Sequence, residues 1–136
     1  MDWGTGQPLE DDRLQIRVDS DGAVTHWGAA LEDVFGYQAG EVLGRKVDFL
    51  IPPMLRALHW RGFNKAVATG QMHRPNKTFR AIGVHKDGHH VAFRSIDVLN
   101  FAEDGSVEGV TGIILDRGWR SLFTRLEATE RAPVAG

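Results

Sequence analysis

Cysteine is absent from the 136 residues of this chain. Its absence excludes disulfide bonds, thiolate ligands for zinc or iron–sulfur clusters, and thiol nucleophiles, so a reducing, cytoplasmic compartment fits best. We expect no signal peptide, because residues 1–13 are acidic and show no basic stretch followed by an apolar core. No apolar run is long enough to span a bilayer, so we also expect no membrane segment.

A strong net charge is also missing, since the formal charge is only -2. Nucleic acid is therefore not an expected partner. The paired acids Asp11–Asp12 and Glu103–Asp104 have no facing base, so we expect no acid–base catalysis and no enzymatic activity. With 42% hydrophobic and 25% charged residues, the composition is that of a globular protein, and the length fits one domain.

The N-terminal half begins with a predicted β-hairpin. Residues 14–18 alternate apolar and polar side chains, residues 19–22 (Asp-Ser-Asp-Gly) have turn chemistry, and residues 23–27 resume a strand. Residues 29–35 have helical spacing and end at Gly36, which is typical of a helix terminus. Short helices are therefore expected to follow the hairpin.

A longer helix is predicted over residues 52–70, with prolines in its first turn and Gly70 at its end. Its apolar face recurs with a period of three to four residues. This face consists of Leu55, Leu58, His59, Gly62, Phe63, Ala66 and Val67. The helix is therefore amphipathic, and a histidine lies within its apolar stripe.

Three strands are predicted next, over residues 78–85, 91–101 and 107–115, separated by two Asp-Gly turns. Together with the first hairpin they form a five-stranded antiparallel sheet, so the fold class is α+β. A last helix is predicted from Trp119, with Leu122, Phe123 and Leu126 on one face. We expect a lead at residues 1–12, a domain at 13–117, and this helix with a frayed tail at 118–136.

This order of elements resembles the PAS superfamily. Four local sequences support the resemblance: Asp19–Gly22 at the first turn, Val34–Tyr37 and Glu41–Gly44 in the short helices, and His85–Gly88 at the late hairpin. The resemblance implies a sensory signal-transduction module that holds a ligand between the long helix and the sheet. The chain departs from the family at residues 116–118, where Asp-Arg-Gly replaces the usual Asp-Ile/Val-Thr.

The chain is similar in particular to the haem-binding PAS domains that sense oxygen and other gases. Counted back from Gly88, His59 falls at the position of the axial histidine in those proteins. His73 falls where the oxygen-sensing kinases carry a second histidine near a haem propionate. The resemblance therefore implies haem b as cofactor, His59 as the iron ligand, and a diatomic gas or redox change as the signal.

The position of His59 on an apolar helix face also implies, without the resemblance, that its imidazole ring needs a partner. Burial of an imidazole costs about 2 to 7 kcal/mol unless a hydrogen bond or a metal satisfies the ring. Haem iron is one such partner, and a hydrogen bond within the core is the other, so both interpretations stay open. For haem, the apolar contacts would come from Leu55, Leu58, Phe63 and Val67. The cations and polar groups for its propionates would come from His73, Arg74, Lys77 and Arg80.

The expected distal side differs from that of the known gas sensors. Phe79 stands where the oxygen sensors have arginine, and Lys77 stands where the phosphodiesterase sensor has a methionine ligand. Ser95 and Asp97 occupy positions that are apolar in those sensors, so Asp97 is either a polar pocket group or a solvent-facing one. Alternatives are therefore a small polar metabolite bound by Ser95 and Asp97, or a haem-free interaction module.

Two further groups of residues are candidate cofactor or metal sites. Trp27, Trp60 and Trp119 could stack on a flavin such as FAD, although tryptophans in small domains usually serve packing. His89 and His90 are adjacent, but neighbours on a strand point to opposite faces and do not readily bind one ion, so a solvated turn is expected. The terminal helices are the predicted homodimer contact.

Overall fold

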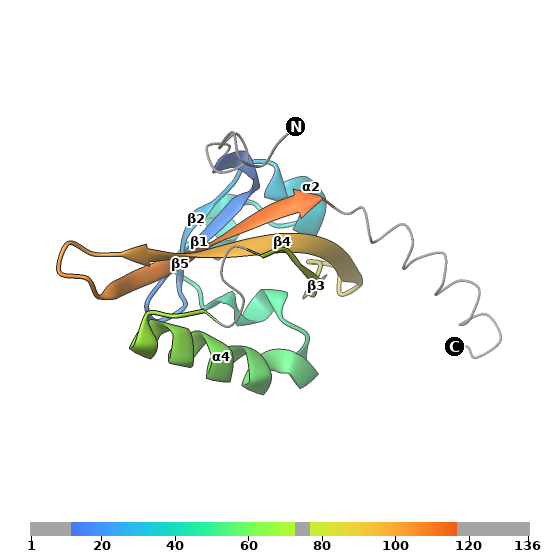
Figure 1. The fold of residues 1–136 in the computed structure, drawn as a ribbon. Coiled ribbons are helices and arrows are strands. Elements are labelled where there is room, and N and C mark those ends of the chain that lie inside the picture. Colours follow the sequence, from blue (N-terminus) through green and yellow to red (C-terminus); the bar gives the residue numbers. More distant parts are fainter. Residues whose placement is uncertain (1–11, 73–76, 117–136) are drawn as a thin grey trace.

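The computed structural model describes residues 12–72 and 77–116. A five-stranded antiparallel sheet in the order β2-β1-β5-β4-β3 forms one layer (Figure 1). The strands are β1 (Gln15–Asp19), β2 (Val24–Trp27), β3 (Phe79–Val84), β4 (His90–Phe101) and β5 (Val107–Asp116). The predicted α+β class and all five predicted strands are confirmed. The predicted C-terminal helix and the residues 1–11 lie outside the described residues.

The turn between β1 and β2 is built by one aspartate and one glycine. The carboxylate of Asp19 accepts hydrogen bonds from the backbone N–H groups of Asp21 at 2.9 Å and Ala23 at 3.0 Å. Gly22 has φ +86°, and a Cβ there would lie 2.3 Å from Cη2 of Trp60. Position 22 therefore requires glycine for two reasons: the left-handed backbone and the close approach of the indole.

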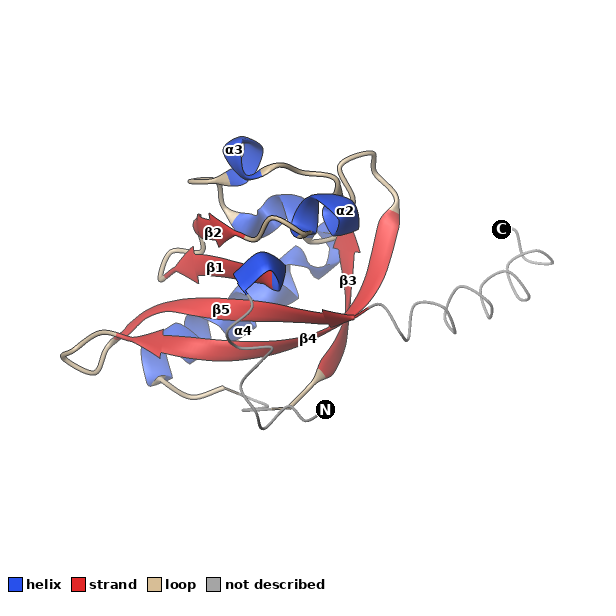
Figure 2. Cartoon of the chain, turned by 90° about the horizontal axis from the view of Figure 1, so that it is seen from above, coloured by secondary structure: helices blue, strands red, loops and turns tan. Residues whose placement is uncertain are grey.

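Short helices cover part of one face of the sheet. Helix α2 (Leu31–Phe35) ends at Gly36, whose φ of 85° and N–H bond to the Glu32 carbonyl close the helix as predicted. Helix α3 (Ala39–Val42) and the 3-10 turn η3 (Val47–Leu50) follow, and the 3-10 turn η2 (Asp12–Leu14) precedes β1. In Figure 2, α2 lies beside the end of β3.

The core lies between these short helices and the sheet. The side chains of Leu31 and Phe35 are fully buried, and the Phe35 ring contacts that of Phe93 edge-on with centroids 5.3 Å apart. The indole of Trp27 joins them and donates a hydrogen bond of 2.8 Å to the carbonyl of Tyr37. This half of the domain is therefore closely packed.

The longer helix covers the rest of that face, where the 3-10 turn η4 (Pro53–Leu55) leads into α4 (Arg56–Thr69). Helix α4 passes along the sheet in Figure 1 and behind β5 and β4 in Figure 2. Its predicted apolar face is not packed as a core: Leu58 is 61% exposed, and only Ala66 is buried. The helix therefore stands over a cavity instead of closing onto the sheet.

Two hydrogen bonds hold the start of α4 near the short helices. Trp60 Nε1 donates to Asp48 Oδ1 at 2.5 Å, and Arg56 Nε donates to the carbonyl of Ile51 at 3.0 Å. Both acceptors lie in or next to η3, so the N-terminal half of the helix is anchored. Within the described ranges, the structure has no helix that is both long and apolar enough to cross a membrane.

Candidate ligand cavity

A cavity of about 480 Å³ lies between α4, η3 and the inner face of the sheet. This volume falls within the range of small-molecule and cofactor sites. Most of its wall is apolar, with contributions from every strand except β2. The apolar residues of the sheet and η3 include Ile16, Val18, Leu50, Phe93, Val110 and Ile114. The cavity therefore favours a ligand with a large apolar surface.

His59 lines this cavity from α4 and is half-buried. Its ring stacks on that of Phe63, with centroids 6.0 Å apart and planes inclined by 21°, and meets the indole of Trp60 edge-on at 4.7 Å. These aromatic contacts restrict the orientation of the imidazole, so it is positioned before any ligand arrives.

One nitrogen of the His59 ring is left unsatisfied. Its Nδ1 is buried and has no hydrogen-bond partner among the residues that the structure describes. Burial lowers the pKa of His59, while the charge of the Asp48 carboxylate acts in the opposite direction. The lowered pKa favours the neutral ring, which is the protonation state in which an imidazole can donate an electron pair to a metal.

Ser95 and Asp97 face the same cavity from β4. They are two residues apart on one strand, so both side chains lie on the inner face of the sheet. Ser95 is buried and hydrogen bonds to the carboxyl group of Asp97, whose Oδ1 would lie 3.3 Å from a Cβ placed at Gly112. Glycine at position 112 therefore leaves the room that this carboxyl group occupies.

Burial raises the pKa of Asp97 to about 6, although the hydrogen bond from Ser95 opposes this shift. Near pH 6 the group therefore exchanges between a carboxylate and a neutral acid. The neutral form can donate a hydrogen bond into the cavity, whereas the carboxylate can only accept one. Asp97, for which the sequence left a pocket and a solvent-facing position open, lies in the wall of the cavity.

Most of the predicted cofactor-binding residues meet at this cavity. His59 is joined there by Leu55, Leu58, Phe63, Phe79, Arg80, Ser95 and Asp97. Two predicted residues are not part of its wall: Val67 lies further along α4, and Lys77 precedes β3. His73 and Arg74 lie outside the described residues. The proposed propionate-binding cluster is therefore represented by Arg80 alone among the residues that line the cavity.

The tryptophans do not form a flavin-stacking surface in the described part of the chain. Trp27 belongs to the packed core beside Phe35, and Trp60 covers Gly22 and bonds to Asp48. Neither one lines the cavity. Trp119, the third candidate, lies outside the described residues. Packing therefore accounts for both described tryptophans, and flavin remains an alternative cofactor that does not depend on them.

Sequence reasoning missed the part of the cavity wall that β5 contributes. Val110, Gly112 and Ile114 alternate along β5 and all face the ligand space. Their period of two is a signal in the sequence, because it places the three residues on one face of a strand. The alternation predicts which face of β5 the three residues occupy. It does not predict that this face borders a cavity, because the same alternation occurs on a strand face packed in a closed core.

Comparisons with known proteins agree with this architecture. No curated protein matches the chain. A PAS domain from Colwellia psychrerythraea superposes with a TM-score of 0.62 at 22% identity, covering 85% of this chain and 97% of that one. A light-oxygen-voltage domain studied with a flavin analogue gives a TM-score of 0.62 at 18% identity, with 93% of each chain covered.

The N-terminal domain of a diguanylate cyclase with a PAS/PAC sensor, from Marinobacter aquaeolei, gives a TM-score of 0.58 at 19% identity. The alignment covers 75% of this chain and 92% of that domain. At these identities the likeness shows the fold. The family model of the PAS fold matches residues 24–114, which include β2, β3, β4, most of β5 and every helix from α2 to α4. The chain therefore belongs to the PAS family of sensory domains.

Proposed function

We propose that this PAS domain is a sensor that binds haem b through His59 and responds to a diatomic gas or to the redox state of the iron. The observation that carries the proposal is the imidazole of His59, which lines an apolar cavity and has a buried nitrogen without a partner. Leaving a buried polar group unsatisfied costs about 1–3 kcal/mol. A metal-bearing cofactor offers this ring a partner that the described residues do not supply.

The residues around His59 fit a haem group in three respects. The cavity wall is largely apolar, as a porphyrin face requires, and Leu55, Leu58 and Phe63 border it beside the histidine. Burial lowers the pKa of the imidazole and so favours its neutral form. Arg80, an exposed residue of β3, borders the cavity and carries a cation of the kind that pairs with a propionate at the rim. When bound, haem would supply an iron centre able to hold a gas or change oxidation state.

The protein's own groups would tune the response. Asp97 offers either a negative charge or a hydrogen-bond donor to whatever occupies the sheet side of the cavity. Val110, Gly112 and Ile114 connect the cavity wall to β5, the last described strand. A ligand that packs differently against these residues in two states would shift the position of β5, and the signal would leave the domain along that strand.

The test is reconstitution of the haem-free chain with haemin, followed by absorbance. We expect one equivalent of haemin to produce a Soret band in the wild-type protein. His59→Ala is expected to lose that band or to show the spectrum of haemin bound without a protein ligand. His90→Ala is the matched control, because His90 is exposed at the start of β4 and does not line the cavity. Equal spectra for His59→Ala and the wild type would refute the assignment.

A second candidate function rests on Asp97 and Ser95. A titratable carboxyl group in a mostly apolar cavity is suited to a small polar metabolite with an apolar body and a hydrogen-bonding or cationic end. Thermal-shift measurements with small amines would test this candidate. It predicts ligands that stabilise the wild type but not Asp97→Asn, whereas the haem proposal predicts that Asp97→Asn still binds haemin.

A further inference from the structure

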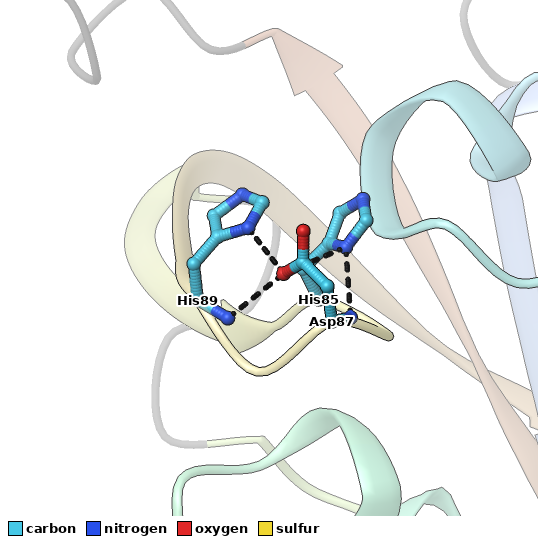
Figure 3. A group of neighbouring side chains, drawn as sticks. All are labelled: His85, Asp87 and His89. Carbon is cyan, nitrogen blue, oxygen red and sulfur yellow. Dashed lines mark hydrogen bonds and ion pairs between the residues drawn. The ribbon is translucent and has the colours of Figure 1, made fainter.

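The hairpin between β3 and β4 brings together three side chains that can ligate a metal, away from the cavity. Figure 3 shows His85 and His89 on either side of Asp87, with both rings directed toward its carboxylate. One ligand atom from each residue can be chosen so that all three lie within 4.8 Å of one another. Nδ1 of His85 is 3.2 Å from Oδ1 of Asp87, and Nδ1 of His89 is 2.5 Å from the same oxygen.

The backbone of the turn determines this convergence. The N–H of His85 donates to the carbonyl of His89 at 2.8 Å, so the two histidines are paired across the hairpin. Gly88 has φ +100° and donates its N–H to the carbonyl of His85 at 2.8 Å, which closes the turn. The imidazole rings stack with centroids 4.4 Å apart. The two rings therefore lie on the same side of the hairpin.

His85 is fixed by the body of the domain. A Cβ at Gly36 would lie 2.5 Å from Cε1 of the His85 ring, so the imidazole packs directly on the end of α2. The N–H of Lys86 donates to the carbonyl of Phe35 at 2.8 Å and ties the hairpin to the same helix. The side chain of His85 is accordingly only 22% exposed. A ligand that is already ordered lowers the entropic cost of binding an ion.

The charge of the cluster suits a cation. The backbone N–H of His89 donates to Oδ1 of Asp87 at 3.0 Å, which holds the carboxyl group toward the two imidazoles. Lys86, the one cation within the turn, has its ammonium group paired with Glu41. Its charge is thus partly neutralised and is directed to another carboxylate.

We infer that His85, Asp87 and His89 form a binding site for a divalent transition-metal ion, with Zn²⁺ as the best match. Two imidazoles and one carboxylate are a ligand set that zinc uses in proteins, with water at the fourth position. Zinc–nitrogen and zinc–oxygen bonds of about 2.0–2.2 Å place tetrahedral ligand atoms about 3.3–3.5 Å apart. The pair formed by His85 and Asp87 is already near this spacing, and zinc would replace the Asp87 N–H that Nδ1 of His85 now accepts at 3.1 Å.

His89 has to move by about 1 Å to reach the same spacing, and its side chain is 50% exposed and so has room to rotate. None of the three residues lines the cavity of His59. The metal site is therefore independent of the proposed haem site, and either can exist without the other. The competing interpretation is a hydrogen-bonded turn that holds no metal.

The experiment is calorimetric titration of Zn²⁺ into the metal-free, haem-free full chain. We expect one equivalent to bind, and we expect His89→Ala and Asp87→Asn each to weaken binding at least about tenfold. His90→Ala is the control and should bind as the wild type does, because the adjacent residue points to the other face of the strand. His59→Ala should also bind zinc normally, which separates this site from the cavity.

A second measurement reports the ligand set directly. Co²⁺ in place of zinc should give the intense visible bands of a tetrahedral site in the wild type, and these bands should be lost in His89→Ala. Circular dichroism of each variant verifies the fold, which is expected to persist because His89 and Asp87 are exposed. Absence of zinc binding by the wild type would overturn the inference. So would a zinc affinity in His89→Ala and Asp87→Asn equal to that of the wild type.

Discussion

Replacing Asp97 by asparagine removes a charge that the fold disfavours. The carboxyl group lies in the cavity wall of β4, beside Gly112 and bonded to Ser95. Burial raises its pKa from the ordinary 3.8 to about 6. Asparagine has nearly the same shape but does not ionise. The change therefore tests the electrostatic cost of this one group with little effect on packing.

The sign and size of the effect follow from proton linkage. Between pH 4 and 6 the folded protein keeps a proton on Asp97 that the unfolded chain releases, so the fold loses stability as the pH rises. A difference of about two pKa units corresponds to about 3 kcal/mol of destabilisation above pH 7. At pH 5 the same relation gives about 1.6 kcal/mol, so about 1.4 kcal/mol is lost between pH 5 and pH 8.

The assay is urea denaturation of the haem-free wild type and of Asp97→Asn at both pH values. We expect the variant to be more stable, with a gain about 1.4 kcal/mol larger at pH 8 than at pH 5. The lowered pKa of His59 makes stability rise with pH up to the ordinary imidazole value. This contribution is present in both proteins and cancels in the comparison. An equal gain at both pH values, or a loss at pH 8, would refute the reasoning.

Three further changes test the packing and the cavity. Gly22→Ala should cost at least about 2 kcal/mol in urea denaturation, because Gly22 has φ +86° and Trp60 occupies the space of a Cβ; a loss below 1 kcal/mol would contradict this. Phe35→Ala should cost about 3–5 kcal/mol by the same assay, since the ring is fully buried, and a near-neutral result would count against the core described above. Ser95→Ala should raise the pKa of Asp97 above 6, as followed by carbon NMR titration of the carboxyl group; an unchanged or lower value would show that the hydrogen bond is unimportant.

Local signals were sufficient to predict the elements of the fold. The turn at Asp19–Gly22 uses side-chain and glycine chemistry that depends only on neighbouring residues, and the structure has that turn. The end of α2 at Gly36 and of α4 at Gly70 follow from the same preference for a left-handed residue. Such features need no knowledge of distant contacts, so the sequence alone predicts them.

The packing of α4 could not be predicted in the same way. Periodicity placed Leu55, Leu58, His59 and Phe63 on one face, and in the structure these four residues line one cavity. It did not indicate that Leu58 would remain 61% exposed. The distance between a helix and a sheet depends on which side chains fill the gap from the other side. Here the opposite side chains come from β4 and β5, and the pairing of these two strands, which lie far along the chain from α4, decides which of them face the helix.

The metal-ligating hairpin was missed because the sequence search considered adjacent histidines. His89 and His90 point to opposite faces, as expected, but the partner of His89 is His85, four residues earlier. That pairing depends on the hydrogen-bond register of the hairpin. The left-handed Gly88 and the bond between His85 and His89 select this register, and sequence spacing alone allows several others.

The central claim is that the imidazole of His59 is the iron ligand, and imidazole rescue tests it most directly. In His59→Gly, the side chain is replaced by a space that free imidazole can enter. We predict that haemin bound to this variant lacks the wild-type spectrum and that adding imidazole restores it. A variant that shows the wild-type spectrum without imidazole, or a wild-type chain that takes up no haemin, would contradict the account.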